Sequence, residues 1–466
     1  MLILYFQIGG ECDKSSSSFT TKQVTFLSLS HDLISWFLYC LDGTNVKVSE
    51  ISNSQQTTMT TNPKAFGLAN NSHQVAYWLI QVFFVGLMIG TTRVVITPFA
   101  EQEFGLAKDS LLLLSTFVIA FGLVKGSMNF VAGHWAERIG RKPVHLLGWI
   151  IALPIPLLFY FAQSWSWVVM ATLLLGVNQG LTWSMSQTSK LDITASHERG
   201  LTIGLNEFAG YTGVALGGLA SAYISQWLGL KTGLLVFGLA IISTALILTW
   251  LSIVETKPWA MQQAQTTSQQ TMSEPLSSWH VFKRMSWQDS RLLAITQAGC
   301  VEKFVDALVW VVYPVYLYQK TGDLTLTGWV ISIYGLVWGV SQLITGHWSD
   351  RFGRQRLNVL GMTMTTLGVI LMPLMTSSLG WSISAAITGF GMALLYPNLS
   401  AAIVDLSQPA WRATAIGIYR FWRDMGYAIG ALTLGLSAFV FQDLTAAFWA
   451  VAVSMGISTV WLAIQG

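Results

Sequence analysis

One nine-residue motif occurs twice in this chain, at a fixed offset. Residues 133–141 read GHWAERIGR and residues 346–354 read GHWSDRFGR, an offset of 213 residues (346 − 133 = 213). The register continues without a gap beyond the motif, through Gly122 and Gly335, Gly126 and Gly339, Gly176 and Gly389, Asp192 and Asp405, Arg199 and Arg412, Gly204 and Gly417, Gly213 and Gly426, and Gly217 and Gly430. A long self-match indicates a duplicated unit, so we expect two related halves.

The composition predicts that both halves lie in a membrane. Charged residues make up 10% of the chain and hydrophobic residues 53%, whereas about 25% of a soluble domain is charged. The basic residues form no stripe with interleaved aromatic residues, which argues against nucleic-acid binding. Cys12, Cys40 and Cys300 are spaced for neither a disulfide framework nor a metal site. We therefore expect no metal and no cofactor.

Twelve apolar runs are long enough to cross a bilayer, for which about 20 helical residues suffice. They are residues 75–99, 109–132, 144–163, 166–189, 200–224, 232–254, 291–317, 324–345, 358–375, 380–404, 413–437 and 443–464. The predicted fold class is an all-α membrane protein with twelve transmembrane helices in two pseudo-symmetric six-helix bundles, residues 75–254 and 291–466. Residues 255–290 are rich in Gln, Ser and Thr and predict a cytoplasmic linker. Paired halves of this kind are typical of secondary transporters.

The Lys and Arg positions predict the orientation. With the linker and both motif loops in the cytoplasm, the opposite side holds only Lys108, Lys231 and Lys320 of the basic residues that flank the spans. This asymmetry predicts a multi-pass protein of the plasma (bacterial inner) membrane with both termini in the cytoplasm. Residues 1–74 are a polar extension that does not conform to this pattern. Two interpretations stay open, a disordered tail or a misplaced gene start ahead of Met59.

The repeated loop, G-x-x-x-[D/E]-R-x-G-R between two apolar helices, resembles the signature of the major facilitator superfamily. The resemblance covers about residues 75–466. Residues 176–184 (GVNQGLTWS), 205–211 (LNEFAGY) and 419–430 (YRFWRDMGYAIG) are similar to members described as bacterial and archaeal efflux permeases. Two departures distinguish the chain from the proton-driven drug antiporters of that superfamily: Thr172 stands where they have an arginine, and Gly218 where they have a proline.

The resemblance implies a conformational latch at the cytoplasmic face. In the family the loop acid, here Glu137 or Asp350, contacts the other half when that side is shut. The arginine beside it, Arg138 or Arg351, pairs with an acid at the end of the fourth helix, here Asp192 or Asp405. The expected latch residues are Gly133, Glu137, Arg138, Gly140, Arg141, Asp192, Gly346, Asp350, Arg351, Gly353, Arg354 and Asp405. Gly140 and Gly353 suit a tight turn. The alternative is a solvated, positively charged loop that only fixes the topology.

Charged residues inside the spans carry the functional prediction. Each costs at least about 2.5–3.5 kcal/mol in a bilayer, so it needs a partner, water or a function. Helical spacing places Glu302 and Asp306 on one side of the seventh span, and a second charged stripe on the eleventh. The candidate cavity residues are Arg93, Gln179, Glu207, Glu302, Asp306, Trp310, Arg420, Arg423 and Asp424. The third, sixth, ninth and twelfth spans carry no charge apart from Asp443, the first residue of the twelfth, and the resemblance implies that they face lipid.

Three finer expectations concern individual charges. Glu207 and Arg420 share the repeat offset, which suggests an ion pair across the pseudo-symmetric centre. Proton uptake by a desolvated carboxylate is expected to couple to transport, and the fork of donors on Arg93 or Arg423 is expected to meet a polar or anionic substrate. Lys125 is expected to extend toward the cytoplasmic surface. The alternative for the whole set is purely structural ion pairing.

These observations predict a secondary active transporter, not an enzyme, that moves a small organic solute by alternating access. Proton-coupled efflux is the preferred mode, and the expected partners are the solute, protons and the lipid bilayer, with the protein a monomer. No residues fit a P-loop, so ATP is not the expected energy source. An uptake permease, proton-independent or a symporter, stays open as an alternative, as does a transport-inactive sensor or scaffold with the same fold.

Overall fold

The computed structural model describes residues 65–105, 111–195, 198–268, 277–408 and 411–465. The described residues form one unit and are almost entirely helical. Most of the polar extension, residues 1–64, lies outside the described part. The first long helix begins at Ser72, three residues before the predicted span.

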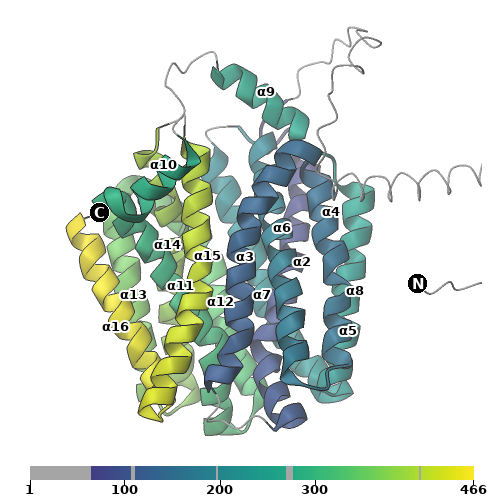
Figure 1. Ribbon diagram of the computed structural model, residues 1–466, viewed down its shortest axis with the longest axis vertical. Helices are drawn as coiled ribbons and strands as arrows, with labels where there is room; N and C mark the ends of the chain where they lie inside the picture. The colour runs from purple at the N-terminus through teal and green to yellow at the C-terminus, as the bar shows by residue number, and fades with distance from the viewer. Residues whose placement is uncertain (1–64, 106–110, 196–197, 269–276, 409–410, 466) are drawn as a thin grey trace, which may run out of the picture. The chain divides into compact units, whose positions relative to one another are not determined.

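Every predicted span coincides with a helix in the described part of the chain (Figure 1). The N-terminal half contains α2 (Ser72–Phe104), α3 (Leu111–Ile139), α4 (Arg141–Ala152), α5 (Pro154–Tyr160), α6 (Trp165–Ile193), α7 (Arg199–Leu228) and α8 (Leu230–Ser252). The C-terminal half contains α11 (Ser290–Thr321), α12 (Leu324–Phe352), α13 (Arg354–Leu374), α14 (Ser378–Leu406), α15 (Arg412–Phe441) and α16 (Thr445–Gln465). α4 and α5 form one span, divided where Pro154 removes a backbone donor.

Ten helical segments in the described residues are long and apolar enough to cross a membrane. α7 and α11 are not among them, although they are 30 and 32 residues long. Both carry fully buried charged side chains, Glu207 on α7 and Glu302 and Asp306 on α11. The charged side chains of these two helices therefore face the protein interior and not the lipid. The count of twelve spanning segments is consistent with the structure.

The four spans that are expected to face lipid are the most peripheral. In α4–α5, α8, α13 and α16, between 33% and 44% of the most apolar stretch is buried, against 50–78% in the other six apolar spans. A helix that exposes most of an apolar surface is stable only against lipid. This agrees with the expected lipid-facing positions.

Within each half, the repeat produces the same close helix contact. A Cβ added to Gly213 on α7 would lie 2.2 Å from the carbonyl oxygen of Phe83 on α2. A Cβ added to Gly426, the equivalent residue on α15, would lie 2.1 Å from the carbonyl oxygen of Cys300 on α11. Only glycine permits this approach. The fifth helix of each half thus packs directly on the first.

Between the halves, the second helix of each packs on the fifth helix of the other. α3 lies along α15, and α7 lies along α12 (Figure 1). Equivalent glycines mark both contacts: Gly122 on α3 faces Tyr427, and Gly335 on α12 faces Ala215. The interface between the halves is therefore itself pseudo-symmetric.

The predicted linker contains helices at one end of the unit, α9 (Lys257–Ser268), α10 (Ser278–Lys283) and a π-helical turn, Arg284–Gln288 (Figure 1). The Gln263 side-chain amide on α9 donates to the backbone oxygen of Asp192, 3.0 Å away, in the N-terminal half. On α10 the Phe282 ring stacks on Trp422 of the C-terminal half. The polar composition did not predict these helices, because tertiary contacts with the bundle ends stabilise them.

Candidate transport site

An ion pair joins the first helices of the two halves. The Arg93 Nη2 atom on α2 lies 3.1 Å from Asp306 Oδ1 on α11. The two side chains are 2% and 0% exposed. They are 213 residues apart, which is the repeat offset. Equivalent positions in the two halves therefore carry opposite charges and meet.

Asp306 is surrounded by four hydrogen-bond donors. Besides Arg93, Lys303 Nζ lies 2.9 Å from Oδ2, the Tyr427 hydroxyl donates to Oδ2 at 2.9 Å, and the Tyr334 hydroxyl donates to Oδ1 at 3.0 Å. A buried carboxylate is tolerated when it is paired and hydrogen-bonded. The donors come from α2, α11, α12 and α15, so Asp306 ties four helices together.

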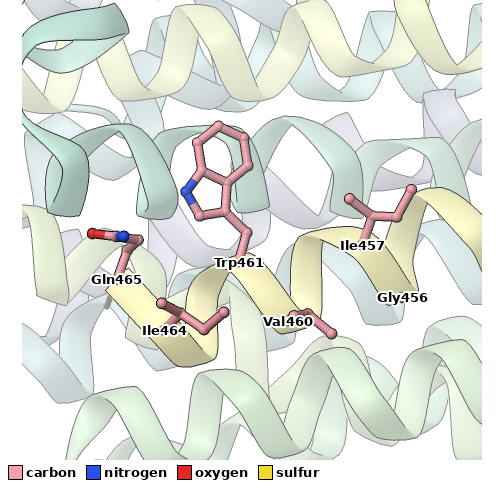
Figure 2. Close-up of a pocket in the computed structure, with 6 residues that line it drawn as sticks. All are labelled: Gly456, Ile457, Val460, Trp461, Ile464 and Gln465. Carbon is pink, nitrogen blue, oxygen red and sulfur yellow. The ribbon is translucent and has the colours of Figure 1, made fainter.

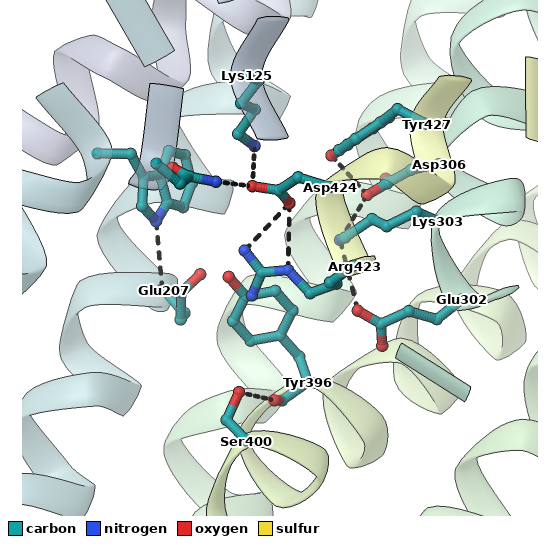
Figure 3. A network of polar contacts seen from close by, with 12 residues as sticks. Lys125, Glu207, Glu302, Lys303, Asp306, Tyr396, Ser400, Arg423, Asp424 and Tyr427 are labelled. Carbon is teal, nitrogen blue, oxygen red and sulfur yellow. Dashed lines mark hydrogen bonds and ion pairs between the residues drawn. The ribbon is translucent and has the colours of Figure 1, made fainter. Parts of the chain in front are cut away.

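Lys303 lies among aromatic rings as well as carboxylates (Figure 3). Its Nζ atom lies 4.8 Å from the centroid of Trp338, 5.1 Å from that of Tyr396 and 5.5 Å from that of Tyr427. The faces of such rings attract a cation. The same Nζ atom lies 3.7 Å from Glu302 Oε1. Lys303 is thus shared between two acids of its own helix.

A second charged group lies where α3 meets α15 (Figure 3). Arg423 Nη2 lies 3.2 Å from Asp424 Oδ1, and Lys125 Nζ lies 3.9 Å from Asp424 Oδ2. The Asn129 amide also donates to this carboxylate. Lys125 is only 7% exposed, so the prediction that it extends to the surface was wrong. Asp424, across the interface, holds it inside.

The predicted Glu207–Arg420 pair was also wrong. Glu207 accepts from the Asn206 amide at 2.8 Å and from Trp183 Nε1 at 3.4 Å, and its Oε2 atom has no hydrogen-bond partner. Arg420 donates instead to Gln187 on α6. The reason lies in the packing. α7 packs on α12 and α15 packs on α3, so the charges of these equivalent residues interact only at a distance and form no direct ion pair.

The two remaining candidates line the same interior. The Gln179 amide on α6 donates to the Val85 backbone oxygen at 3.0 Å, and its Oε1 atom has no hydrogen-bond partner. Trp310 on α11 is fully buried, with the Arg93 guanidinium 5.6 Å from its ring centroid. Its edge-on contacts with Phe117 and Phe121 reach across to α3.

The N-terminal loop motif pairs with the acid at the end of the fourth helix through Arg141, and not through Arg138 as the family resemblance implied. Arg141 Nε lies 2.8 Å from Asp192 Oδ2. The Thr256 hydroxyl, at the start of the linker, donates to the same oxygen at 2.9 Å. Gly140 has a φ of +100°, as its predicted tight turn requires. Asp192 thereby connects the loop, α6 and the linker.

The C-terminal motif repeats this arrangement. Arg354 pairs with Asp405, and Gly353 has a φ of +84°. The side chains of Asp350 and Arg351 and the surroundings of Gly346 lie outside the described residues. In the first copy Gly133, Glu137 and Arg138 are exposed. The pairing is present in both halves, and the role of these residues as a latch stays a prediction.

Several residues of the network were not among the sequence candidates. They are Lys125, Asn129, Gln187, Lys303, Tyr334, Trp338, Tyr396 and Tyr427. The repeat could have identified some of these residues, because the offset of 213 relates Trp183 to Tyr396 and Lys125 to Trp338. The remaining aromatic residues resemble ordinary packing residues in sequence.

The charged network is closed to solvent. Its eight ionisable residues are between 0% and 7% exposed: Arg93, Lys125, Glu207, Glu302, Lys303, Asp306, Arg423 and Asp424. A different hollow, of about 590 Å³, lies on the outer face of α16 and is lined by Gly456, Ile457, Val460, Trp461, Ile464 and Gln465 (Figure 2). Its lining is mainly apolar and belongs to a peripheral helix, so it suits lipid chains and not a polar solute.

Three relatives found by comparison with known proteins are all named as transporters or efflux pumps. An uncharacterized MFS-type transporter of Salmonella typhimurium is 23% identical over 75% of this chain and 86% of its own length. A "probable 4-methylmuconolactone transporter" of Cupriavidus pinatubonensis is 26% identical over 72% and 76%. A homologue of the multidrug resistance efflux pump PmrA in Lactococcus lactis is 22% identical over 74% and 84%.

The fold itself has a solved counterpart. The human organic anion transporter MFSD10 superposes with a TM-score of 0.64 at 15% identity, over 84% of this chain and 99% of that one. The sequence profile described as the Major Facilitator Superfamily matches residues 78–301 and 298–465. The chain is a multi-pass membrane protein and belongs to the major facilitator superfamily of transporters.

Proposed function

We propose that this transporter exports a small organic solute by alternating access, coupled to protons. One observation carries the proposal: the Arg93–Asp306 pair joins the two halves inside a charged network that is closed to solvent. Buried ion pairs are weak stabilisers, because desolvation offsets much of the attraction. Intramembrane charges of this density are therefore best explained by transport.

The geometry provides for substrate binding. The Nε and Nη1 atoms of Arg93 are buried and have no hydrogen-bond partner. Arginine presents its donors in a planar fork that matches carboxylates and other polar groups. A solute that enters between the halves can take these donors, while the Trp310 ring beside the guanidinium offers an apolar face.

The packing supports movement of one half against the other. The halves meet mainly along α3–α15 and α7–α12. Rocking about these contacts would expose the network first to one side of the membrane and then to the other. The loop pairs Arg141–Asp192 and Arg354–Asp405 are proposed to latch the cytoplasmic side.

The direction of efflux is supported by the relative named as a multidrug efflux pump. A second candidate, proton-linked uptake of an organic acid or lactone, is favoured by the relative named as a lactone transporter and by the free donors of Arg93. We further propose a monomer in the plasma membrane, with both termini in the cytoplasm and bundles at residues 75–254 and 291–466 joined by the linker.

Vesicles reconstituted with the purified protein test both candidates. Ethidium and radiolabelled 4-methylmuconolactone are the two probes, each followed with an imposed pH gradient of either sign. Efflux predicts movement of a probe against the proton gradient, whereas the uptake candidate predicts movement with it. Accumulation of a probe that does not depend on the imposed pH gradient would contradict proton coupling. No movement of either probe, with binding still detected by thermal shift, would favour a sensor.

A further inference from the structure

Glu302 is a fully buried carboxylate without a hydrogen-bond donor. Neither of its oxygens has a hydrogen-bond partner, and its side chain is 0% exposed. The nearest cation, Lys303 Nζ, is 3.7 Å away, beyond hydrogen-bond distance. One turn further along α11, Asp306 has four donors. The two acids therefore have opposite environments.

This difference has a chemical consequence. Burying an ionised carboxylate without donors is far more costly than burying its neutral acid. The titratable and charged groups that face Glu302 come from its own helix and from α15: Cys300, Lys303, Asp306, Tyr419, Arg423 and Asp424. The Tyr419 hydroxyl is also buried and makes no hydrogen bond to Glu302. The surroundings of Glu302 thus accommodate its protonated form.

Glu302 is also connected to the contact between the halves. Charges of alternating sign follow one another in the order Glu302, Lys303, Asp306 and Arg93, at 3.7, 2.9 and 3.1 Å. The first three residues lie on α11, and the last lies on α2 in the other half. A change of charge at Glu302 therefore acts on Arg93 through Lys303 and Asp306.

We propose that Glu302 binds the transported proton and that Lys303 transmits this event to the Arg93–Asp306 pair. This inference rests on the proton coupling proposed above. A proton taken from water on one side forms an O–H bond on Glu302 and is released to water on the other side. While Glu302 is ionised, Lys303 is shared by two acids. Once Glu302 is neutral, Lys303 is drawn to Asp306 alone, and the hold of Asp306 on Arg93 weakens.

Infrared difference spectroscopy of the purified full-length protein tests the proton site. Acidification is expected to produce a carboxylic-acid C=O band that Glu302→Gln removes. The matched change Glu207→Gln, at the buried carboxylate of the other half, is expected to keep the band. Glu302→Asp retains a carboxyl group and is also expected to keep it, which separates loss of the proton site from misfolding.

Each outcome has a distinct meaning. A band that persists in Glu302→Gln, or that disappears only in Glu207→Gln, overturns the assignment of Glu302 and leaves proton coupling intact. The absence of any protonation in the wild-type protein, by infrared or by a pH-indicator dye, overturns proton coupling itself. For the relay, amide hydrogen exchange in α2 and α11 is compared at one alkaline pH. Glu302→Gln should exchange several-fold faster than wild type, and equal rates would overturn the role of Lys303.

Discussion

Arg93 and Asp306 occupy the same position in the two copies of the repeat and bind each other across the centre of the molecule. Duplication alone would place identical residues there. The opposite charges show that the two halves have diverged where they meet. At the pseudo-symmetric centre, the two halves are therefore joined by a polar contact between α2 and α11, and not by apolar packing.

Removal of Arg93 should destabilise the protein, because it leaves the Asp306 carboxylate short of a partner. Breaking a buried pair in this way typically costs about 3–5 kcal/mol. Arg93→Ala is therefore expected to lower the unfolding midpoint in detergent. Arg199→Ala, which truncates an exposed arginine on α7, is the control and should leave the midpoint unchanged. Equal midpoints for the two variants would contradict the importance of the pair.

The equivalent glycines give a matched test of helix packing. A methyl group at Gly426 would collide with the carbonyl oxygen of Cys300, 2.1 Å away, whereas one at Gly417 meets nothing within 4 Å. We expect Gly426→Ala to reduce the monodisperse yield in size-exclusion chromatography sharply. Gly417→Ala should fold normally, since alanine favours a helix by about 1 kcal/mol over glycine. Normal yield from Gly426→Ala would argue against the close packing of α15 on α11.

Asp192 should hold the linker helix α9 as well as the loop arginine. Its carboxylate accepts from Arg141 and Thr256, and its backbone oxygen accepts from Gln263. We expect Asp192→Asn to raise amide hydrogen exchange in α9, because both acceptor contacts weaken when the carboxylate loses its charge. Asp405→Asn, the equivalent change in the other half, is the control. Unchanged exchange in α9 would show that the linker is held in another way.

The proposed orientation can be tested by labelling. Met261 on α9 and Trp227 at the end of α7 are 57% and 84% exposed. Cysteine at position 261 should react with a membrane-impermeant maleimide only in inside-out vesicles, and cysteine at position 227 only in intact cells. Both variants need a background in which the native cysteines are replaced. Labelling of both sites from one side would refute the topology.

The sequence predicted the helices well because the repeat and the apolar runs are long signals. Through the family resemblance it also identified Asp192 as the partner of a loop arginine, but it assigned the pairing to Arg138 and not to Arg141. The sequence did not predict the correct charge pairs between the two halves. The repeat offset identifies equivalent positions, but it does not show which helices contact each other. Arg93 and Asp306 face each other since α2 approaches α11, whereas Glu207 and Arg420 lie on helices with different partners.

One further error and one feature that was not predicted have similar causes. Lys125 seemed close enough to the surface to reach water, but Asp424 from the other half makes the buried position favourable. The linker helices depend on contacts such as Phe282 with Trp422, which lie far apart in the chain. Neither partner can be identified from local sequence.

The central claim is that two halves rock about a buried charged network. Double electron–electron resonance measures it directly with two spin-label pairs. Leu201 and Ile344 lie toward the proposed cytoplasmic ends of α7 and α12, and Leu113 and Phe439 toward the opposite ends of α3 and α15. As the pH is lowered in a lipid nanodisc, one of the two label distances, Leu201 to Ile344 or Leu113 to Phe439, should lengthen while the other shortens. Two distances that stay fixed, or that change in the same direction, would contradict alternating access.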